Sequence, residues 1–203
     1  MTAIYENYES PWMDDELSIL RDAAHRFFST EFVPHKDRWI EQGKVDRDAW
    51  NKAGEAGLLC AEIPAQYGGG GGDYRHETIV TEEQLGAGIS GFGNQVHSQI
   101  VAPYLLHYGD EEQKQKWLPK MATGEMVGAI AMTEPNTGSD LHNVKTSATK
   151  KGDSYVINGA KTYITNGIHA DLVVLVAKTD PNLGAKGISL IIVEANTKGF
   201  NKG

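Results

Sequence analysis

A change in residue pattern near Gly124 constrains the fold of this chain more than any other feature. From about residue 14 to 122, apolar residues recur at steps of three and four, as Leu17, Leu20 and Ala24 do, which is the spacing of amphipathic helices. After Gly124 the chain consists of short runs rich in Val, Ile, Thr and Tyr, separated by Gly, Asn and Asp. The sequence therefore predicts an α+β fold, with an all-α domain over 1–124 and an antiparallel β-barrel or sandwich domain over 125–203.

Cap and turn residues divide both halves into elements. Asp46 is expected to cap a helix whose end is marked by Gly57. In the second half, Asn158-Gly159 and residues 150–154 fit hairpin turns. The strands expected there cover residues 126–132, 144–149, 154–157, 161–165, 171–178 and 187–194.

Composition excludes several classes of function. A net charge of -8 argues against nucleic-acid binding, because affinity for a phosphate backbone comes from clustered Lys and Arg. The single cysteine, Cys60, excludes an internal disulfide and is expected to be packed in the core. The seven histidines are scattered without a His-Glu-x-x-His pattern, so no metal site is expected.

Targeting and membrane signals also count against some classes. Residues 1–17 lack the cationic stretch and apolar core of a leader peptide. The longest aliphatic run, residues 172–177, is too short to span a bilayer. We therefore expect a cytoplasmic protein without membrane insertion.

Two glycine-rich motifs have ordinary structural interpretations. Residues 86–91 match the G-x-G-x-x-G dinucleotide fingerprint, but that motif requires a preceding strand, and the preceding ETIVTEEQL is typical of a helix. A helix-helix corner is the favoured interpretation. The run Gly68–Gly72 lacks the Lys-Ser/Thr of a phosphate-binding loop, so we expect a flexible surface connection.

Two polar stretches in the second half carry the strongest indication of a site: MTEPNTGSD at 132–140 and KTYITNG at 161–167. Taken singly, each is equally consistent with an ordinary turn or strand. Taken together, they place four side chains at strand ends of one small sheet: Thr133, Ser139, Tyr163 and Thr165. Such a rim suits a planar cofactor with polar edges. If 161–165 is a strand, Tyr163 and Thr165 point to the same face.

The same stretches resemble the acyl-CoA dehydrogenase family. AMTEPNTGSD is similar to the family's flavin-contacting loop, and NGAKTYITNG is similar to its second flavin strand. WNKAGEAGLL, IPAQYGGGGGD and YGDEEQKQKWLPKMATGE extend the resemblance through the helical half, so that it spans almost all 203 residues. The details of WLPKM and ISLIIVEANTKGF favour the long-chain branch.

The resemblance implies a fold and a reaction. A C-terminal helical bundle, which this chain does not contain, would complete the FAD site against the β domain. The implied reaction is α,β-dehydrogenation of an acyl-CoA thioester in fatty-acid or branched-chain catabolism, with electrons passed to an electron-transferring flavoprotein. The catalytic base would be a glutamate beyond Gly203, so the chain alone is expected to be inactive. Glu134 is not expected to be the base, because it matches a structural position of the motif. The implied assembly is a homotetramer, a dimer of dimers.

Roles at the rim also follow from the resemblance. Thr133 would bond to the pyrimidine edge of the flavin, Thr165 would bond near N5, and Tyr163 would shield the ring face opposite the substrate. Ser139 would lie near the FAD phosphates or the entrance for the pantetheine of the substrate. The full set of implied cofactor contacts is Ile130, Met132, Thr133, Gly138, Ser139, Tyr163, Ile164 and Thr165.

Two other functions stay open on the sequence alone. An acyl-CoA oxidase or a nitroalkane oxidase would use the same scaffold and would differ in rapid reoxidation of its flavin by oxygen. A noncatalytic binding or assembly module would bind FAD and acyl-CoA without turnover.

Overall fold

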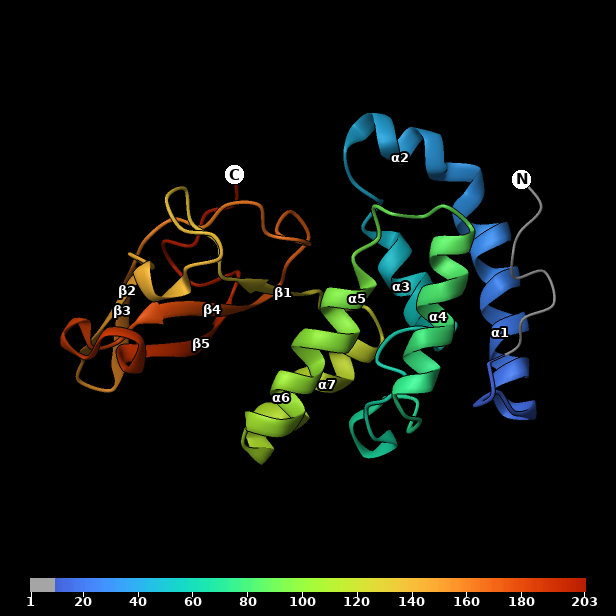
Figure 1. Ribbon diagram of the computed structural model, residues 1–203, viewed down its shortest axis with the longest axis horizontal. Coiled ribbons are helices and arrows are strands. Elements are labelled where there is room, and N and C mark those ends of the chain that lie inside the picture. Colours follow the sequence, from blue (N-terminus) through green and yellow to red (C-terminus); the bar gives the residue numbers. More distant parts are fainter. Residues whose placement is uncertain (1–9) are drawn as a thin grey trace.

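The computed structural model describes residues 10–203, in which a helical part and a β-sheet lie side by side (Figure 1). Residues 1–9, which begin the stretch judged free of a leader, lie outside this description. The helices are α1 (Asp15–Phe27), α2 (Lys36–Gln42), α3 (Asp48–Glu55), α4 (Tyr74–Gly86), α5 (Asn94–Val96), α6 (Ala102–Tyr108) and α7 (Glu111–Ala122). Among these helices, none combines the length and the apolar character that crossing a membrane requires.

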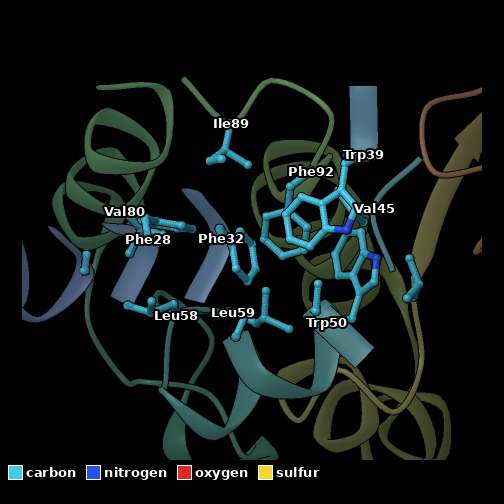
Figure 2. Close-up of a cluster of buried hydrophobic side chains, with 14 residues drawn as sticks. Phe28, Phe32, Trp39, Val45, Trp50, Leu58, Leu59, Val80, Ile89 and Phe92 are labelled. Atoms are coloured by element: carbon cyan, nitrogen blue, oxygen red, sulfur yellow. The ribbon is translucent and has the colours of Figure 1, made fainter. Parts of the chain in front are cut away.

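An aromatic cluster forms the core of the helical part (Figure 2). Phe28 and Phe32 lie in the π-helical turn that follows α1, and Trp50 of α3 packs into the same cluster. The ring centroid of Phe32 lies 5.0 Å from that of Phe92 and 5.1 Å from that of Trp39, both edge to face. Such pairs stabilise a core beyond the burial of their apolar area. In α1, Leu17 and Ala24 are buried and Leu20 packs against the cluster, so the amphipathic pattern predicted for this helix is confirmed.

The strands form one open, mixed sheet around β4: β1 (Gly128–Ala131), β2 (Ser147–Lys151), β3 (Ser154–Asn158), β4 (Leu172–Lys178) and β5 (Ile188–Glu194). β1 runs parallel to β4 and β5 runs antiparallel to it, while β2 and β3 form an antiparallel hairpin. The predicted order of a helical and then a β region is confirmed. The sheet, however, is neither closed nor purely antiparallel. The chain returns to the residue before β1, where the Asp171 N–H donates to the Val127 carbonyl (2.8 Å), and β4 then runs beside β1 in the same direction.

The strand predicted at 161–165 is wrong. Tyr163 has a φ of 55°, in the left-handed region that β-strands do not use. Consequently Asn158-Gly159 does not close a hairpin. The strand expected at 144–149 begins only at Ser147, because the backbone N–H groups before it bind a carboxylate instead of a neighbouring strand.

The remaining β predictions are confirmed. β1, β3, β4 and β5 occupy the other four predicted ranges. The turn at 150–154 joins β2 to β3, with Gly152 at a φ of 60° next to the paired residues Lys151 and Ser154. A glycine suits that position because its missing Cβ removes the steric cost of a positive φ.

Two predictions in the helical half need correction. Asp46 does not cap α3, because its carboxylate pairs with Arg38, although Gly57 ends the helix as expected, with a φ of 70°. The glycine run at 68–72 is not a free connection: the Gly70 and Gly72 N–H groups donate to backbone carbonyls (3.2 and 3.0 Å). These glycines allow the loop to pack directly on the backbone of the preceding segment.

A second core cluster joins the helices to the sheet. Leu105 of α6 and Trp117 of α7 pack with Leu172 and Val174 of β4. Figure 1 shows α6 and α7 on the side of the helical part that faces the sheet. The apolar faces of both parts are thus buried against each other, which is the dominant source of stability at such a junction.

Arg47 fastens this junction from the helical side. Its guanidinium donates to the carbonyls of Gly124 (2.8 Å) and Glu125 (2.7 Å), which link α7 to β1. It also lies 3.2 Å from the carboxylate of Asp171, at the start of β4. Arg47, which immediately precedes α3, therefore binds both the linker and the residue that precedes β4.

His97 fastens the same junction from inside. The Gly128 N–H donates to Nδ1 of His97 (3.0 Å), and Nε2 of His97 donates to the carbonyl of Met121 (3.1 Å). The ring is fully buried, and this burial lowers the pKa of His97 to about 4. Protonation would place a second proton on Nδ1, opposite the Gly128 N–H, so the junction requires the neutral ring.

We expect the contribution of His97 to stability to be lost in mild acid. The unfolded ring, with a pKa of about 6.5, takes up its proton before the folded ring does, so stability is full above about pH 6.5 and falls toward pH 4. Between pH 7 and 4.5 the free energy of unfolding of the wild-type protein should fall by about 2 kcal/mol more than that of His97→Gln, because one pKa unit corresponds to roughly 1.4 kcal/mol. Urea denaturation across this range measures the difference, and parallel stability curves would contradict the assignment.

Candidate functional site

The two polar stretches singled out in the sequence lie against each other at the end of β1. The Thr162 N–H donates to the carbonyl of Thr133 (2.9 Å). The ammonium of Lys161 donates to the carbonyl of Met132 (2.9 Å). We call residues 131–134 and 161–166 together the rim. The adjacency predicted for the two stretches is therefore present, although it is built by loops and not by paired strands.

Glu134 is the centre of the hydrogen bonds that hold the rim. Its carboxylate accepts from the backbone N–H groups of Lys145 (2.6 Å) and Thr146 (2.9 Å) and from the ammonium of Lys161 (2.9 Å). The Glu134 and Lys161 side chains are only 5% and 9% exposed. Burial alone would raise the pKa of Glu134, but the hydrogen bonds from Thr146, Lys161 and Lys145 lower it to about 2.

These contacts define Glu134 as a structural carboxylate. Three donors of the protein hold its carboxylate, and the residue is itself closed into a tight turn by reciprocal backbone hydrogen bonds with Thr137 (2.8 and 3.1 Å). A group with a pKa of about 2 does not accept a proton near neutral pH. The exclusion of Glu134 as a catalytic base is thus consistent with its surroundings.

A turn of two left-handed residues completes the rim. Tyr163 has a φ of 55° and Asn166 a φ of 66°. The Asn166 amide donates to the carbonyls of Gly93 (2.8 Å) and Gly128 (3.1 Å), and so ties the turn to both the helical part and β1. The Tyr163 side chain is 93% exposed. A strained backbone thus presents an aromatic ring to the outside of the protein.

The rim brings five of the expected cofactor residues together and leaves three apart. Ile164 packs against the small apolar cluster that includes Ala131. Ile130 packs on the other face of β1, against the cluster that joins the helices to the sheet. Gly138 and Ser139 are exposed and follow the tight turn at Glu134. The residues gathered at the rim are Met132, Thr133, Tyr163, Ile164 and Thr165.

The orientation expected for Tyr163 and Thr165 is wrong, because they do not lie on a strand. The methyl group of Thr165 lies close to Gly93, where an added Cβ would approach it to 2.8 Å. Thr165 therefore sits against the helical part, whereas Tyr163 projects away from the protein. The left-handed turn separates two side chains that a strand would have aligned.

The polar groups at the rim fit a planar cofactor with hydrogen-bonding edges. Within residues 10–203, the Thr133 and Thr165 hydroxyls and the Thr133 N–H at the rim make no hydrogen bond to the protein, and neither does the hydroxyl of Ser139 on the loop that follows. Free polar groups and an exposed aromatic side chain on the same two loop segments are suited to binding a ligand. In the same part of the chain, no three His, Cys, Asp or Glu side chains are grouped to hold a metal ion.

Sequence reasoning missed three residues that build this site: Lys161, Asn166 and Gly93. The signal for Lys161 is a lysine at the head of an otherwise uncharged run, but its partner stands far away in the sequence. Asn166 carried a usable signal, because asparagine tolerates a positive φ and often marks a turn. Gly93 gave none, because its role depends on the close approach of Thr165 and Asn166.

The other motifs have structural roles. Gly88, inside the G-x-G-x-x-G match, has a φ of 73° just after α4, so the predicted helix corner is confirmed. Cys60 is fully buried, and this burial raises the pKa of its thiol. Its predicted packed position is confirmed as well.

Comparison with known proteins identifies the two parts of the chain. Residues 14–125 match the family model of the acyl-CoA dehydrogenase N-terminal domain, and residues 129–203 match that of the acyl-CoA dehydrogenase middle domain. The mouse protein named long-chain specific acyl-CoA dehydrogenase, mitochondrial, is 45% identical over 190 residues, which cover 93% of this chain and 44% of that protein.

Solved structures agree in fold. An acyl-CoA dehydrogenase from Geobacillus kaustophilus has a TM-score of 0.91 and 47% identity, over 94% of this chain and 51% of that one. An acyl-CoA dehydrogenase complexed with FAD from Bacillus anthracis has a TM-score of 0.84 and 33% identity, over 95% of this chain and 33% of that one. This chain thus spans about half or less of the proteins that it matches.

We expect glycine to stabilise the protein at position 163. The left-handed conformation costs a residue with a Cβ about 1–2 kcal/mol, which exceeds the extra chain entropy that glycine loses, roughly 0.4–1 kcal/mol. Tyr163→Gly should therefore be about 1 kcal/mol more stable than Tyr163→Ala in urea denaturation of the FAD-free protein. Tyr155, exposed on β3, is the matched control, where glycine should be the less stable of the two. If the alanine variant were the more stable one at position 163 as well as at position 155, the backbone of Tyr163 would not be strained.

Proposed function

Because the chain belongs to the acyl-CoA dehydrogenase family, we propose that the complete protein removes hydrogen from the α and β carbons of an acyl-CoA thioester with FAD as its cofactor. The observation that carries this proposal is the rim, where two hydrogen-bonded loop segments carry unbonded threonine hydroxyls, the free Thr133 N–H and the exposed side chain of Tyr163. Such an arrangement suits a flat ring system with hydrogen-bonding edges. The Bacillus anthracis relative whose structure contains FAD supports the choice of cofactor.

We assign different parts of the flavin to different rim residues. When bound, FAD supplies the acceptor for the hydride that leaves the β carbon. We assign one ring edge to the Met132–Thr133 backbone and the Thr133 hydroxyl, and the region near N5 to the Thr165 hydroxyl. Tyr163 would cover one ring face, and Ile164 anchors this segment by packing against the apolar cluster that includes Ala131.

The remaining expected contacts have smaller or more distant roles. Ile130 is assigned to the cofactor through its backbone only, because its side chain packs in the cluster between the helices and the sheet. We place Gly138 and Ser139 toward the FAD phosphates or the pantetheine of the substrate. Both are exposed on the loop that follows the Glu134 turn.

Proton removal needs a group outside the rim. A thioester α-proton is weakly acidic, so its removal requires a base with a pKa near neutrality and donors to the thioester oxygen. Glu134 does not fit, because its bonded carboxylate has a pKa of about 2. We assign the base to a glutamate outside these 203 residues.

We extend the proposal to the acyl-chain length, the electron acceptor, the oligomeric state and the cellular compartment of the complete protein. We favour long acyl chains, because the mouse relative is named as long-chain specific. We further propose that electrons leave to an electron-transferring flavoprotein, that the complete protein is a homotetramer, and that it is cytoplasmic.

One experiment separates this function from its alternatives. The complete protein, loaded with FAD and mixed anaerobically with saturated acyl-CoA thioesters of several lengths, should lose its flavin absorbance, fastest with long chains. Rapid recovery of the colour on admission of air would favour an oxidase. Binding of both FAD and acyl-CoA without bleaching at any chain length would favour a noncatalytic module and would overturn the proposal.

We expect Thr165→Val to slow flavin reduction, because the hydroxyl assigned to the region near N5 is replaced by a methyl group. The protein should remain folded, because valine and threonine have nearly the same shape. A tenfold slower reduction, equivalent to about 1.4 kcal/mol of transition-state stabilisation, is the smallest effect that the assignment allows. Stopped-flow spectroscopy measures the rate. Thr149→Val, on the exposed side of β2, is the control and should reduce at the wild-type rate. Equal rates in both variants would remove Thr165 from the site.

A further inference from the structure

Lys161 is a buried lysine whose two partners lie on the rim. Its ammonium donates to the Met132 carbonyl and to the Glu134 carboxylate, both at 2.9 Å. With a side chain only 9% exposed, it has little access to water. Lysine is rarely buried to this degree unless it is paired, so this position places a fixed positive charge directly behind the rim backbone.

The carbonyl that Lys161 binds belongs to the same peptide unit as the Thr133 N–H. That N–H makes no hydrogen bond within residues 10–203, and the next carbonyl along, that of Thr133, is held by the Thr162 N–H (2.9 Å). A cation bound to a peptide oxygen withdraws electron density from the peptide and makes its N–H a stronger donor. Water screens this effect little at a buried site.

Glu134 opposes this polarisation. Its carboxylate shares the ammonium with the Met132 carbonyl and also accepts two backbone N–H groups just before β2. The carboxylate holds Lys161 in place and neutralises part of its charge. The polarity of the Thr133 N–H is thus set by the balance between a lysine and a glutamate that do not reach the outer face of the rim.

We propose that Lys161 is a positioning residue that acts on the flavin through the Met132–Thr133 peptide, orienting its N–H and strengthening it as a hydrogen-bond donor. This inference rests on the proposed function, since it assigns the Thr133 N–H to the cofactor. Reduction adds electrons to the flavin, and a stronger donor at its edge favours the electron-rich form. Lys161 should therefore raise both the affinity for FAD and the midpoint potential of the bound flavin.

The two partners of the pair should shift the potential in opposite directions. Lys161→Met removes the charge behind the peptide, so the potential should become more negative and the Kd for FAD should rise about tenfold, a change of roughly 1.4 kcal/mol. Glu134→Gln leaves the ammonium on the Met132 carbonyl without its counter-charge, so the potential should become more positive. A purely structural role would move both variants in the same direction, because either change breaks the same ion pair.

The measurements use the complete protein at pH 7. Fluorescence titration gives the Kd for FAD, equilibration with a redox dye gives the midpoint potential, and thermal melting by circular dichroism gives stability. Lys116→Met is the control, because Lys116 forms a lysine–glutamate pair with Glu194 (2.7 Å) that lies away from the rim and is more exposed than the Lys161 pair. Lys161→Arg keeps the charge and should retain a near wild-type potential.

The outcomes separate this inference from the proposed function. Opposite shifts in the two variants, with unchanged values in the Lys116 control, support the inference. If wild type binds FAD and Lys161→Met matches it in affinity and potential, the inference fails and the function stands. If Lys161→Met does not fold, the sign of the shift in Glu134→Gln decides, and a negative or absent shift overturns the inference. A wild-type protein that takes up no FAD would overturn both.

Discussion

The buried ion pair between Glu134 and Lys161 is the interaction on which the candidate site depends. It joins the loop after β1, the start of β2 and the segment that leads into the left-handed turn. Breaking such a pair by removing one partner leaves a buried charge uncompensated and typically costs about 3–5 kcal/mol. The pair therefore fixes the backbone of the rim before any ligand arrives, which lowers the entropy cost of binding.

The junction between the helices and the sheet carries this rim. Asn166 binds carbonyls on both sides of the junction, His97 holds the first residue of β1, and Arg47 holds the linker before it. The rim and the junction thus share the same short stretch of backbone. A change that loosens the junction is expected to alter the rim as well, because the two are built on common hydrogen bonds.

Sequence patterns predicted what depends on local periodicity and failed where distant contacts decide. The apolar spacing of α1 and the aliphatic run that became β4 were sufficient, because α1 buries Leu17 and Ala24 of its apolar stripe and β4 is buried along most of its length. Residues 161–165 have the composition of a strand, yet tertiary bonds from Lys161 and Asn166 hold them in a turn. Neither bond is visible in a single sequence, because each partner stands 27 or more residues away.

A crystal structure of the complete protein with FAD would show whether the rim holds the flavin and whether Lys161 stays on the Met132 carbonyl in the complex. We expect the isoalloxazine ring at the rim, with the Thr133 N–H within hydrogen-bond distance of its edge and the Lys161 ammonium within hydrogen-bond distance of the Met132 carbonyl. A ring bound elsewhere, or a Lys161 side chain turned away to solvent in the complex, would show that this pair does not build the flavin site.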